Sequence, residues 1–278
     1  MNIKPFKCQT LAFFLFFGGF TLLSTQVLQA QATLNTNAED TYYRTGLELF
    51  DKQKYGAAQQ AFQEYIRLAT LAGTQSGPNN LKVVDAQYYS GICALYLFNP
   101  DAEVQIDRFI ADHPQHPKAI FAYYELGQFY FTKKDYPKAI EYFSKIDSEQ
   151  LNLEQTIDMK FKLGYAYFTT QDFEKARPAF DDLKRSNHKY TAAANYYSGY
   201  INYKLGNYDE ALKDLKKAEK DPAYQNEVPY MVANVYYKQQ RYDELLAYTE
   251  SIIGKPELQP TTTEKPKGAK KPGKALPG

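Results

Sequence analysis

Few side chains in this sequence have types and spacings that could support chemistry. His113 and His116, in the segment His-Pro-Gln-His-Pro, are the only two histidines close together. A zinc site needs further cysteine, histidine or carboxylate ligands at a defined spacing, and no such cluster accompanies them. His188 falls in a polar turn and is expected to be solvated. We therefore expect no metal site and no cofactor.

The acidic pairs are weak candidates for catalysis. Asp181-Asp182 and Asp209-Glu210 are more simply explained as charges at helix starts or on outer helix faces. The sequence also lacks a P-loop, a His-Glu-x-x-His zinc motif, a Gly-x-Ser-x-Gly nucleophile motif and a dinucleotide fingerprint. These observations predict a protein that is not an enzyme.

Residues 1–32 have the features of a secretory signal peptide. Lys4 and Lys7 precede an apolar run from Leu11 to Leu23, and Ala30-Gln31-Ala32 offers a small-residue cleavage site. The run is shorter than the roughly 20 residues that a membrane span needs. An uncleaved N-terminal anchor remains the alternative.

Cysteine usage is consistent with removal of this segment. Cys8 lies inside it, which leaves Cys93 alone in the exported chain, without a disulfide partner. Cys93 stands in an apolar stretch, Ile-Cys-Ala-Leu, and we expect it to be buried as a small hydrophobic residue.

Charge gives little indication of a partner, because the 278 residues carry a formal net charge of +1. No nucleic-acid partner is expected. Residues 255–278 differ from the rest, with six Lys and five Pro against two Glu, and are predicted to be a disordered Lys/Pro/Gly-rich tail. Such a tail is either simply solvated or in contact with an anionic membrane surface.

A helix-pair pattern recurs through most of the chain. Each copy has a small residue in its first helix and, in five of the six copies, a second one eleven or twelve residues later, where two antiparallel helices would cross. The first-helix small residues are Gly46, Gly91, Gly127, Gly164, Gly199 and Ala233. The second-helix partners are Ala58, Ala102, Ala139, Ala176 and Ala211, with Leu245 in the sixth copy. Matched offsets in six copies indicate a repeat architecture.

The repeat resembles the tetratricopeptide repeat (TPR). The third copy carries the motif residues of that family as Leu126-Gly127, Tyr130, Ala139 and Phe143, and the fourth as Leu163-Gly164, Tyr167, Ala176 and Phe180. The absence of Trp, a short turn at Asn99-Pro100 and the sixth copy depart from the pattern. The resemblance implies an all-α, right-handed α-solenoid of about six helix-turn-helix repeats.

The resulting domain plan has four parts. Residues 1–32 are the signal peptide, 33–38 a flexible leader, 39–254 the TPR solenoid, and 255–278 the tail. The expected repeats are about 39–70, 84–114, 120–150, 157–187, 192–221 and 226–253. The wider spacing between the first two copies is assigned to an exposed loop, Thr70–Asn80, rich in turn-forming residues.

In this family the first helices line a concave groove, and three sites on each first helix face it. We define them from the small residue of each copy: the proximal site three residues before it, the middle site one after, and the distal site four after. The proximal sites are Tyr43, Tyr88, Tyr124, Phe161, Tyr196 and Tyr230. The middle sites are Leu47, Ile92, Gln128, Tyr165, Tyr200 and Asn234. The distal sites are Phe50, Leu95, Phe131, Phe168, Tyr203 and Tyr237.

An aromatic residue occupies the proximal site in all six copies, which the repeat itself does not require. Rigid rings along a groove suit a peptide ligand. The predicted partner-binding groove comprises Tyr43, Tyr88, Tyr124, Gln128, Phe161, Tyr165, Tyr196, Tyr200, Tyr203, Tyr230 and Asn234. The alternative is that the proximal rings are buried between neighbouring first helices. If they bind, Tyr196→Ala with Tyr200→Ala would abolish partner capture at near-normal stability.

The functional expectation is an exported, non-catalytic protein-interaction scaffold. The resemblance is to periplasmic TPR proteins of double-membrane bacteria that serve envelope assembly, secretion or cell-wall work. The alternative is a structural spacer or oligomerisation arm, or the N-terminal part of a longer repeat protein, without a groove ligand. Self-association through an uncapped C-terminal helix would fit that alternative, since solenoid ends need covering.

Overall fold

A computed structural model describes residues 40–71 and 81–253. The predicted signal peptide, the leader, most of the Thr70–Asn80 loop and the basic tail lie outside these residues. Thr70 does not begin a loop, because helix α2 continues to Leu71 and the Thr70 hydroxyl donates to the Ile66 carbonyl within it.

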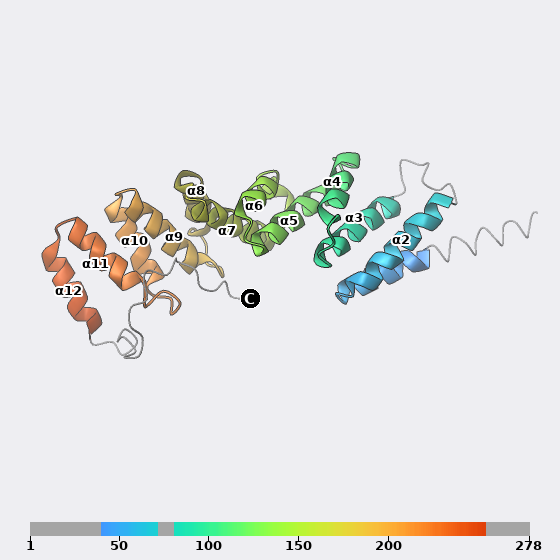
Figure 1. The fold of residues 1–278 in the computed structure, drawn as a ribbon. Coiled ribbons are helices and arrows are strands. Elements are labelled where there is room, and N and C mark those ends of the chain that lie inside the picture. Colours follow the sequence, from blue (N-terminus) through green and yellow to red (C-terminus); the bar gives the residue numbers. More distant parts are fainter. Residues whose placement is uncertain (1–39, 72–80, 254–278) are drawn as a thin grey trace, which may run out of the picture. The chain divides into compact units, whose positions relative to one another are not determined.

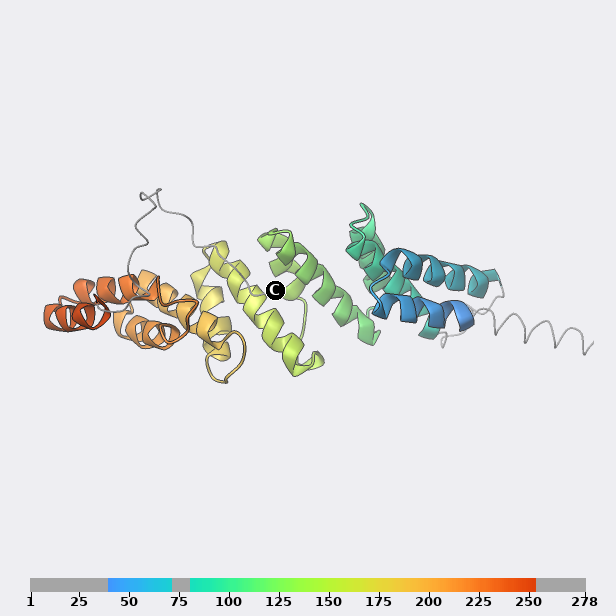
Figure 2. The ribbon, with the colours of Figure 1, turned by 90° about the horizontal axis from the view of Figure 1, so that it is seen from below.

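The described residues form helices in antiparallel pairs, with no strand among them (Figures 1 and 2). A first helix covers residues 40–51. It is followed by α2 (Tyr55–Leu71), α3 (Leu81–Tyr96), α4 (Ala102–Asp112), α5 (Pro117–Thr132), α6 (Tyr136–Phe143), α7 (Leu153–Thr169), α8 (Phe173–Leu183), α9 (Thr191–Lys204), α10 (Tyr208–Ala218), α11 (Val228–Lys238) and α12 (Tyr242–Ile253). A short 3-10 helix, η2 (Ser148–Gln150), precedes α7.

Each pair turns at one residue with a left-handed backbone. The residue with positive φ is Gln53, Phe98, Lys134, Gln171, Gly206 or Gln240, one in each of the six turns. In two pairs an aspartate follows it directly as the N-cap of the second helix: the side chains of Asp135 and Asp172 accept from backbone N–H groups of the next turn. The short polar turns of the sequence therefore close the hairpins.

Small residues allow the two helices of a pair to cross closely. A Cβ on Gly46 would lie 2.6 Å from the Phe62 ring, and one on Gly199 would lie 2.7 Å from Leu215 Cγ. Phe62 and Leu215 are fully buried beside these crossings. The motif glycines and the large residues of the second helices thus form one packing unit, as the sequence predicts.

The chain divides into two compact units, Met1–Phe129 and Tyr130–Gly278. In the first, α2 packs on α3 and α3 on α4. In the second, each helix from α6 to α12 packs on the next. The sequence has 26 Tyr and 18 Phe. The cores of both units are rich in aromatic rings and alanines, so many of these rings pack between helices.

Candidate protein-binding surface

Most proximal rings are buried. Tyr88, Tyr124, Phe161 and Tyr196 are all nearly inaccessible, Tyr43 is half-buried and Tyr230 is exposed. Phe161 stacks on Tyr190 with ring centroids 4.0 Å apart, and Tyr196 stacks on Tyr224 at 4.7 Å. In the middle copies the proximal site therefore packs one repeat against the next, which is the alternative left open by the sequence.

Two proximal hydroxyls also link consecutive first helices. Tyr43 Oη donates to Asp85 at 3.2 Å, and Tyr196 Oη donates to Glu227 at 3.1 Å. Burial and the adjacent carboxylate both raise the pKa of Tyr196 well above its ordinary value, so the ring keeps its proton. Replacing Tyr196 would cost stability as well as surface, so the double alanine variant with Tyr200 would not isolate binding.

The middle sites that belong to the predicted groove are more accessible. Gln128, Tyr165 and Tyr200 are half-buried, and Asn234 is exposed. Tyr200 packs its ring edge on Phe168 at 5.2 Å, and the Lys204 ammonium lies 5.3 Å from its centroid. Of the distal sites named in the predicted groove, Tyr203 is half-buried. The accessible part of that groove is thus carried by the middle sites, with Tyr203 and Tyr230.

The histidines take structural roles. His113 Nε2 lies 3.0 Å from the Gln87 side chain, and His116 Nε2 lies 3.7 Å from Asp85. His188 is not solvated as expected: its Nδ1 accepts from the Tyr190 N–H, and its Nε2 is buried without a hydrogen bond among the described residues. Within residues 40–71 and 81–253 no group of three or more potential metal ligands occurs.

Cys93 is fully buried, as predicted, and burial raises the pKa of its thiol to about 12. A thiol with so high a pKa is protonated at neutral pH and is a poor nucleophile.

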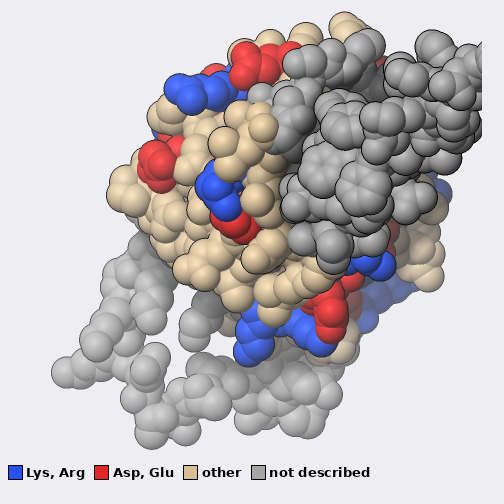
Figure 3. All heavy atoms as spheres, turned by 90° about the vertical axis from the view of Figure 1, so that its right-hand side faces the viewer, with Lys and Arg blue, Asp and Glu red and all other residues tan. Residues whose placement is uncertain are grey.

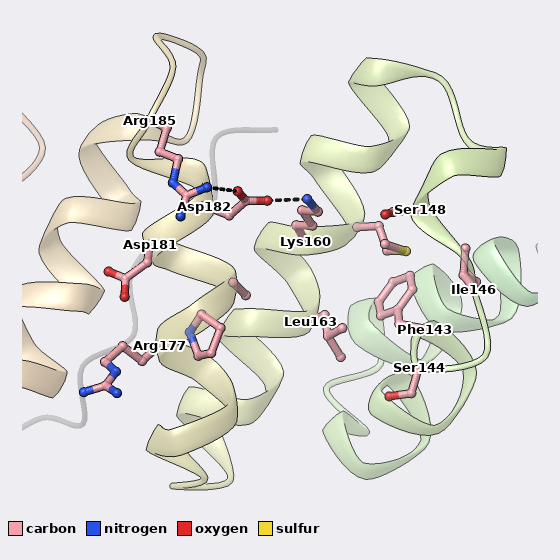
Figure 4. Close-up of a pocket in the computed structure, with 13 residues that line it drawn as sticks. Phe143, Ser144, Ile146, Ser148, Lys160, Leu163, Arg177, Asp181, Asp182 and Arg185 are labelled. Atoms are coloured by element: carbon pink, nitrogen blue, oxygen red, sulfur yellow. Dashed lines mark hydrogen bonds and ion pairs between the residues drawn. The ribbon is translucent and has the colours of Figure 1, made fainter.

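An open cleft of about 600 Å³ lies between α6, α7 and α8 (Figure 4). Phe143, Met159 and Leu163 contribute its apolar wall. On its rim Asp182 pairs with Lys160 and, at 3.4 Å, with Arg185, as the dashed lines in Figure 4 show. The charges of Lys160, Asp182 and Arg185 on the rim thus offset one another.

The predicted acidic pairs have different surroundings. Asp181 and Asp182 lie near the end of α8 and not at a helix start, and both form ion pairs. Asp209 and Glu210 lie in the first turn of α10, where negative charge is favourable.

Asp158 carries a pH-dependent contribution to stability. It is mostly buried, pairs with Lys162 at 2.6 Å and accepts from Tyr190 Oη at 2.5 Å. Burial alone would raise its pKa, but these contacts outweigh burial and lower it. Because the folded-state pKa is depressed, the stabilisation is present above the ordinary aspartate pKa of about 3.9 and is lost as the pH falls through the folded value.

We therefore expect Asp158→Asn to be less stable than the wild type at neutral pH. The difference should shrink as the pH falls below about 4, where the wild-type carboxylate is protonated too. Urea unfolding at several pH values measures it. A difference that stays constant with pH would show that the charge of Asp158 contributes nothing.

Charged side chains are intermixed on the face that Figure 3 shows, where blue and red groups lie beside each other and neither sign gathers into a broad patch. No helix within the described ranges is long and apolar enough to cross a membrane.

Comparison with known proteins gives the fold family. Residues 161–226 and residues 122–150 match family models described as tetratricopeptide repeats. A tetratricopeptide repeat protein of Parabacteroides merdae is 16% identical and has a TM-score of 0.50, covering 80% of this chain and 81% of its own. The apo form of RapI is 14% identical with a TM-score of 0.51, covering 76% and 63%. MamA of AMB-1 is 20% identical with a TM-score of 0.49, covering 66% and 90%.

At these identities the structures show the fold alone, and no curated protein matches the sequence. Together with the repeat geometry, these matches show that the chain carries tetratricopeptide repeats and that its described residues have an all-α fold of helix pairs. Proteins of this family bind other proteins, and its members are typically non-catalytic.

Proposed function

We propose that the protein is an exported, non-catalytic scaffold that binds a protein or peptide partner along the accessible side of its first helices. The observation that carries the proposal is that the middle sites of the second unit, Tyr165, Tyr200 and Asn234, stay accessible, while most proximal rings are used for packing. Tyrosine offers rigid apolar area together with a hydroxyl, which suits recognition of a peptide.

Site-specific photo-crosslinking in the native cell tests this surface. A photoreactive residue in place of Tyr200 should form a covalent adduct with the partner. The same residue in place of Lys213, an exposed side chain of the second helix α10, should not. Adducts of equal yield at both positions would contradict the proposal, because contact would then not depend on the first-helix side.

Export rests on the N-terminal sequence and makes a separate prediction. The mature protein should begin at Gln31 or Thr33 and fractionate with the cell envelope. Mass spectrometry of the intact protein determines the N-terminus. A chain that keeps residues 1–30 would support the uncleaved anchor.

A structural arm remains the second candidate. Burial of the proximal rings favours it, because a spacer needs rings only for packing. Self-association through α12 belongs to this candidate, and sedimentation measures it. A monomer over the accessible concentration range would contradict it.

A further inference from the structure

The last helix pair exposes side chains whose equivalents one copy earlier are buried. Tyr230 is 68% exposed, whereas Tyr196 at the same site is 6% exposed. Leu246 of α12 is 61% exposed, whereas Leu212 at the same place in α10 is 6% exposed. We call the surface of Tyr230, Tyr237, Tyr242 and Leu246 the end face. α12 has no buried residue, whereas α10 buries five.

The end face carries the same kind of aromatic pair as the surfaces that receive a helix within the chain. In four repeats the aromatic ring at the distal site contacts an aromatic ring at the start of the second helix. These pairs are Phe50 with Tyr55, Phe168 with Phe173, Tyr203 with Tyr208 and Tyr237 with Tyr242. The last two pairs have centroid separations of 6.1 and 6.2 Å. The rings of the end face are thus already arranged as they are where a helix covers them.

Three described cores show what packs on such a surface. The first helix of the next repeat packs on it through three residues. They lie five residues before its small residue, one residue before it and two residues after it. In α11 these are Val228, Val232 and Val235, all fully buried against α10. In α9 they are Ala194, Ser198 and Ile201, and in α3 they are Ala86, Ser90 and Cys93, again all buried. In these three helices the matching surface is a stripe of small or β-branched side chains.

A carboxylate in the first turn completes the match. Asp85 and Glu227 lie at the same place, six residues before the small residue, and accept from the proximal hydroxyls Tyr43 and Tyr196. Tyr230 presents the same hydroxyl at the end face. The complementary helix thus carries an acid at position i and small or β-branched apolar residues at i+1, i+5 and i+8.

We propose that the end face binds an amphipathic helix of this pattern from a partner protein, so that the partner continues the stack by one helix. The proposal does not depend on the first-helix groove. It rests on continuity with the interfaces between α2 and α3, α8 and α9, and α10 and α11, each of which uses the same chemistry.

A second copy of this chain does not supply such a helix. Its first helix carries Thr41, Thr45 and Glu48 at the three stripe positions, and all three are exposed. Burying Glu48 against the end face would cost the desolvation of a charge. The stripes of α3, α9 and α11 are already buried in their own stack. Most stripe residues of α5 and α7 are buried as well, namely Ala122, Leu126, Met159 and Ala166. Of the described helices, the first therefore presents a polar stripe, whereas the last pair presents an apolar end face.

Residues 254–278 do not supply it either, by sequence. They contain five prolines and six lysines, and no acid is followed by apolar residues at i+1, i+5 and i+8. Proline inside such a stretch would interrupt the helix that the match requires.

The test uses the full chain and a labelled peptide of residues 226–240, which carries the pattern as Glu227, Val228, Val232 and Val235. A staple through the positions of Asn234 and Lys238, both exposed in α11, would hold the peptide helical. We expect saturable binding in fluorescence anisotropy. Leu246→Glu should weaken it by about tenfold or more, since it places a charge in an apolar contact.

Matched controls separate this site from unspecific apolar contact. Leu153→Glu alters another exposed leucine, in α7 and far along the sequence from the end face, and should leave binding unchanged. A peptide with Val232→Asp should not bind. Tyr230→Phe should weaken the wild-type peptide but not a Glu227→Gln peptide, because both changes remove the same hydrogen bond.

Three results would overturn the proposal: no saturable binding to the wild type, equal loss in Leu153→Glu, or binding of the Val232→Asp peptide. A wild-type chain that sediments as a dimer, and becomes a monomer in Leu246→Glu, would also overturn it by assigning the end face to a second copy. Because Leu246 is exposed, both leucine variants are expected to fold, and unchanged thermal melting checks this.

Discussion

Asp214→Ala is expected to lower the free energy of unfolding by about 3 kcal/mol, because it removes one partner of a buried ion pair. Asp214 lies in α10 with almost no exposure and accepts from Lys184 Nζ at 2.7 Å. Ser198 donates to the same carboxylate at 3.0 Å and Asn202 at 3.4 Å. The three donors come from α9 and the end of α8, so the network joins three consecutive helices.

The expected loss of stability is large because the Lys184 ammonium would remain partly buried without its Asp214 partner. Burial disfavours its charge, but the contacts with Asp181 and Asp214 outweigh burial and raise the pKa of the ammonium. Without Asp214 the Lys184 ammonium keeps only one carboxylate partner, Asp181, at 2.7 Å. The remaining pair keeps the expected cost at the lower end of the range for broken buried ion pairs, about 3–5 kcal/mol.

Urea unfolding of two further variants distinguishes the contribution of the Asp214 charge from the contribution of its side-chain shape. Asp214→Asn keeps acceptors for Ser198 and Asn202 and should lose clearly less stability than Asp214→Ala. Glu210→Ala, in the same helix but exposed, should change it by less than about 1 kcal/mol. Equal losses for Asp214→Ala and Glu210→Ala would contradict a buried network.

Gly199→Ala is expected to destabilise the protein by about 2 kcal/mol through overpacking. The added Cβ would lie 2.7 Å from Leu215 Cγ and 3.1 Å from the Leu215 backbone nitrogen. Neither atom is the far end of a flexible side chain, so α9 and α10 must move apart. The higher helix propensity of alanine, about 1 kcal/mol, offsets only part of this cost.

Gly56→Ala is the matched control. A Cβ there meets nothing within 4 Å, and Gly56 lies in the first turn of α2, so the change should stabilise the helix by up to about 1 kcal/mol. Combining Gly199→Ala with Leu215→Val should cost less than the sum of the two single changes, because the smaller side chain relieves the contact. Strict additivity would show that the close contact is not the cause.

Much of the fold could be predicted from the sequence because its signals are local. Gly46 and Gly199 mark helix crossings, since only a missing side chain allows so close an approach. The Ala at the second-helix site and the large residue four later identify the opposite helix. These residues act within one hairpin, so their spacing along the chain is also their spacing in space.

The candidate site was less predictable. Tyr196 and Tyr230 occupy the same site in the repeat, yet one is buried and the other exposed. The difference comes from the following copy: α11 covers Tyr196, whereas no described helix follows α12 to cover Tyr230. Exposure depends on a neighbour beyond the hairpin, and the sequence of a single repeat does not contain it.

The sequence alone thus determined the repeat, the helix pairs and the absence of catalytic motifs, because each depends on residue type and short spacing. The tertiary structure decided which aromatic rings hold repeats together and which remain accessible. It also showed that Thr41, Thr45 and Glu48 of the first described helix are exposed and polar, while Tyr230 and Leu246 of the last pair are exposed and apolar. The physical reason is that burial is a property of the contact between repeats, which forms only when the helices stack.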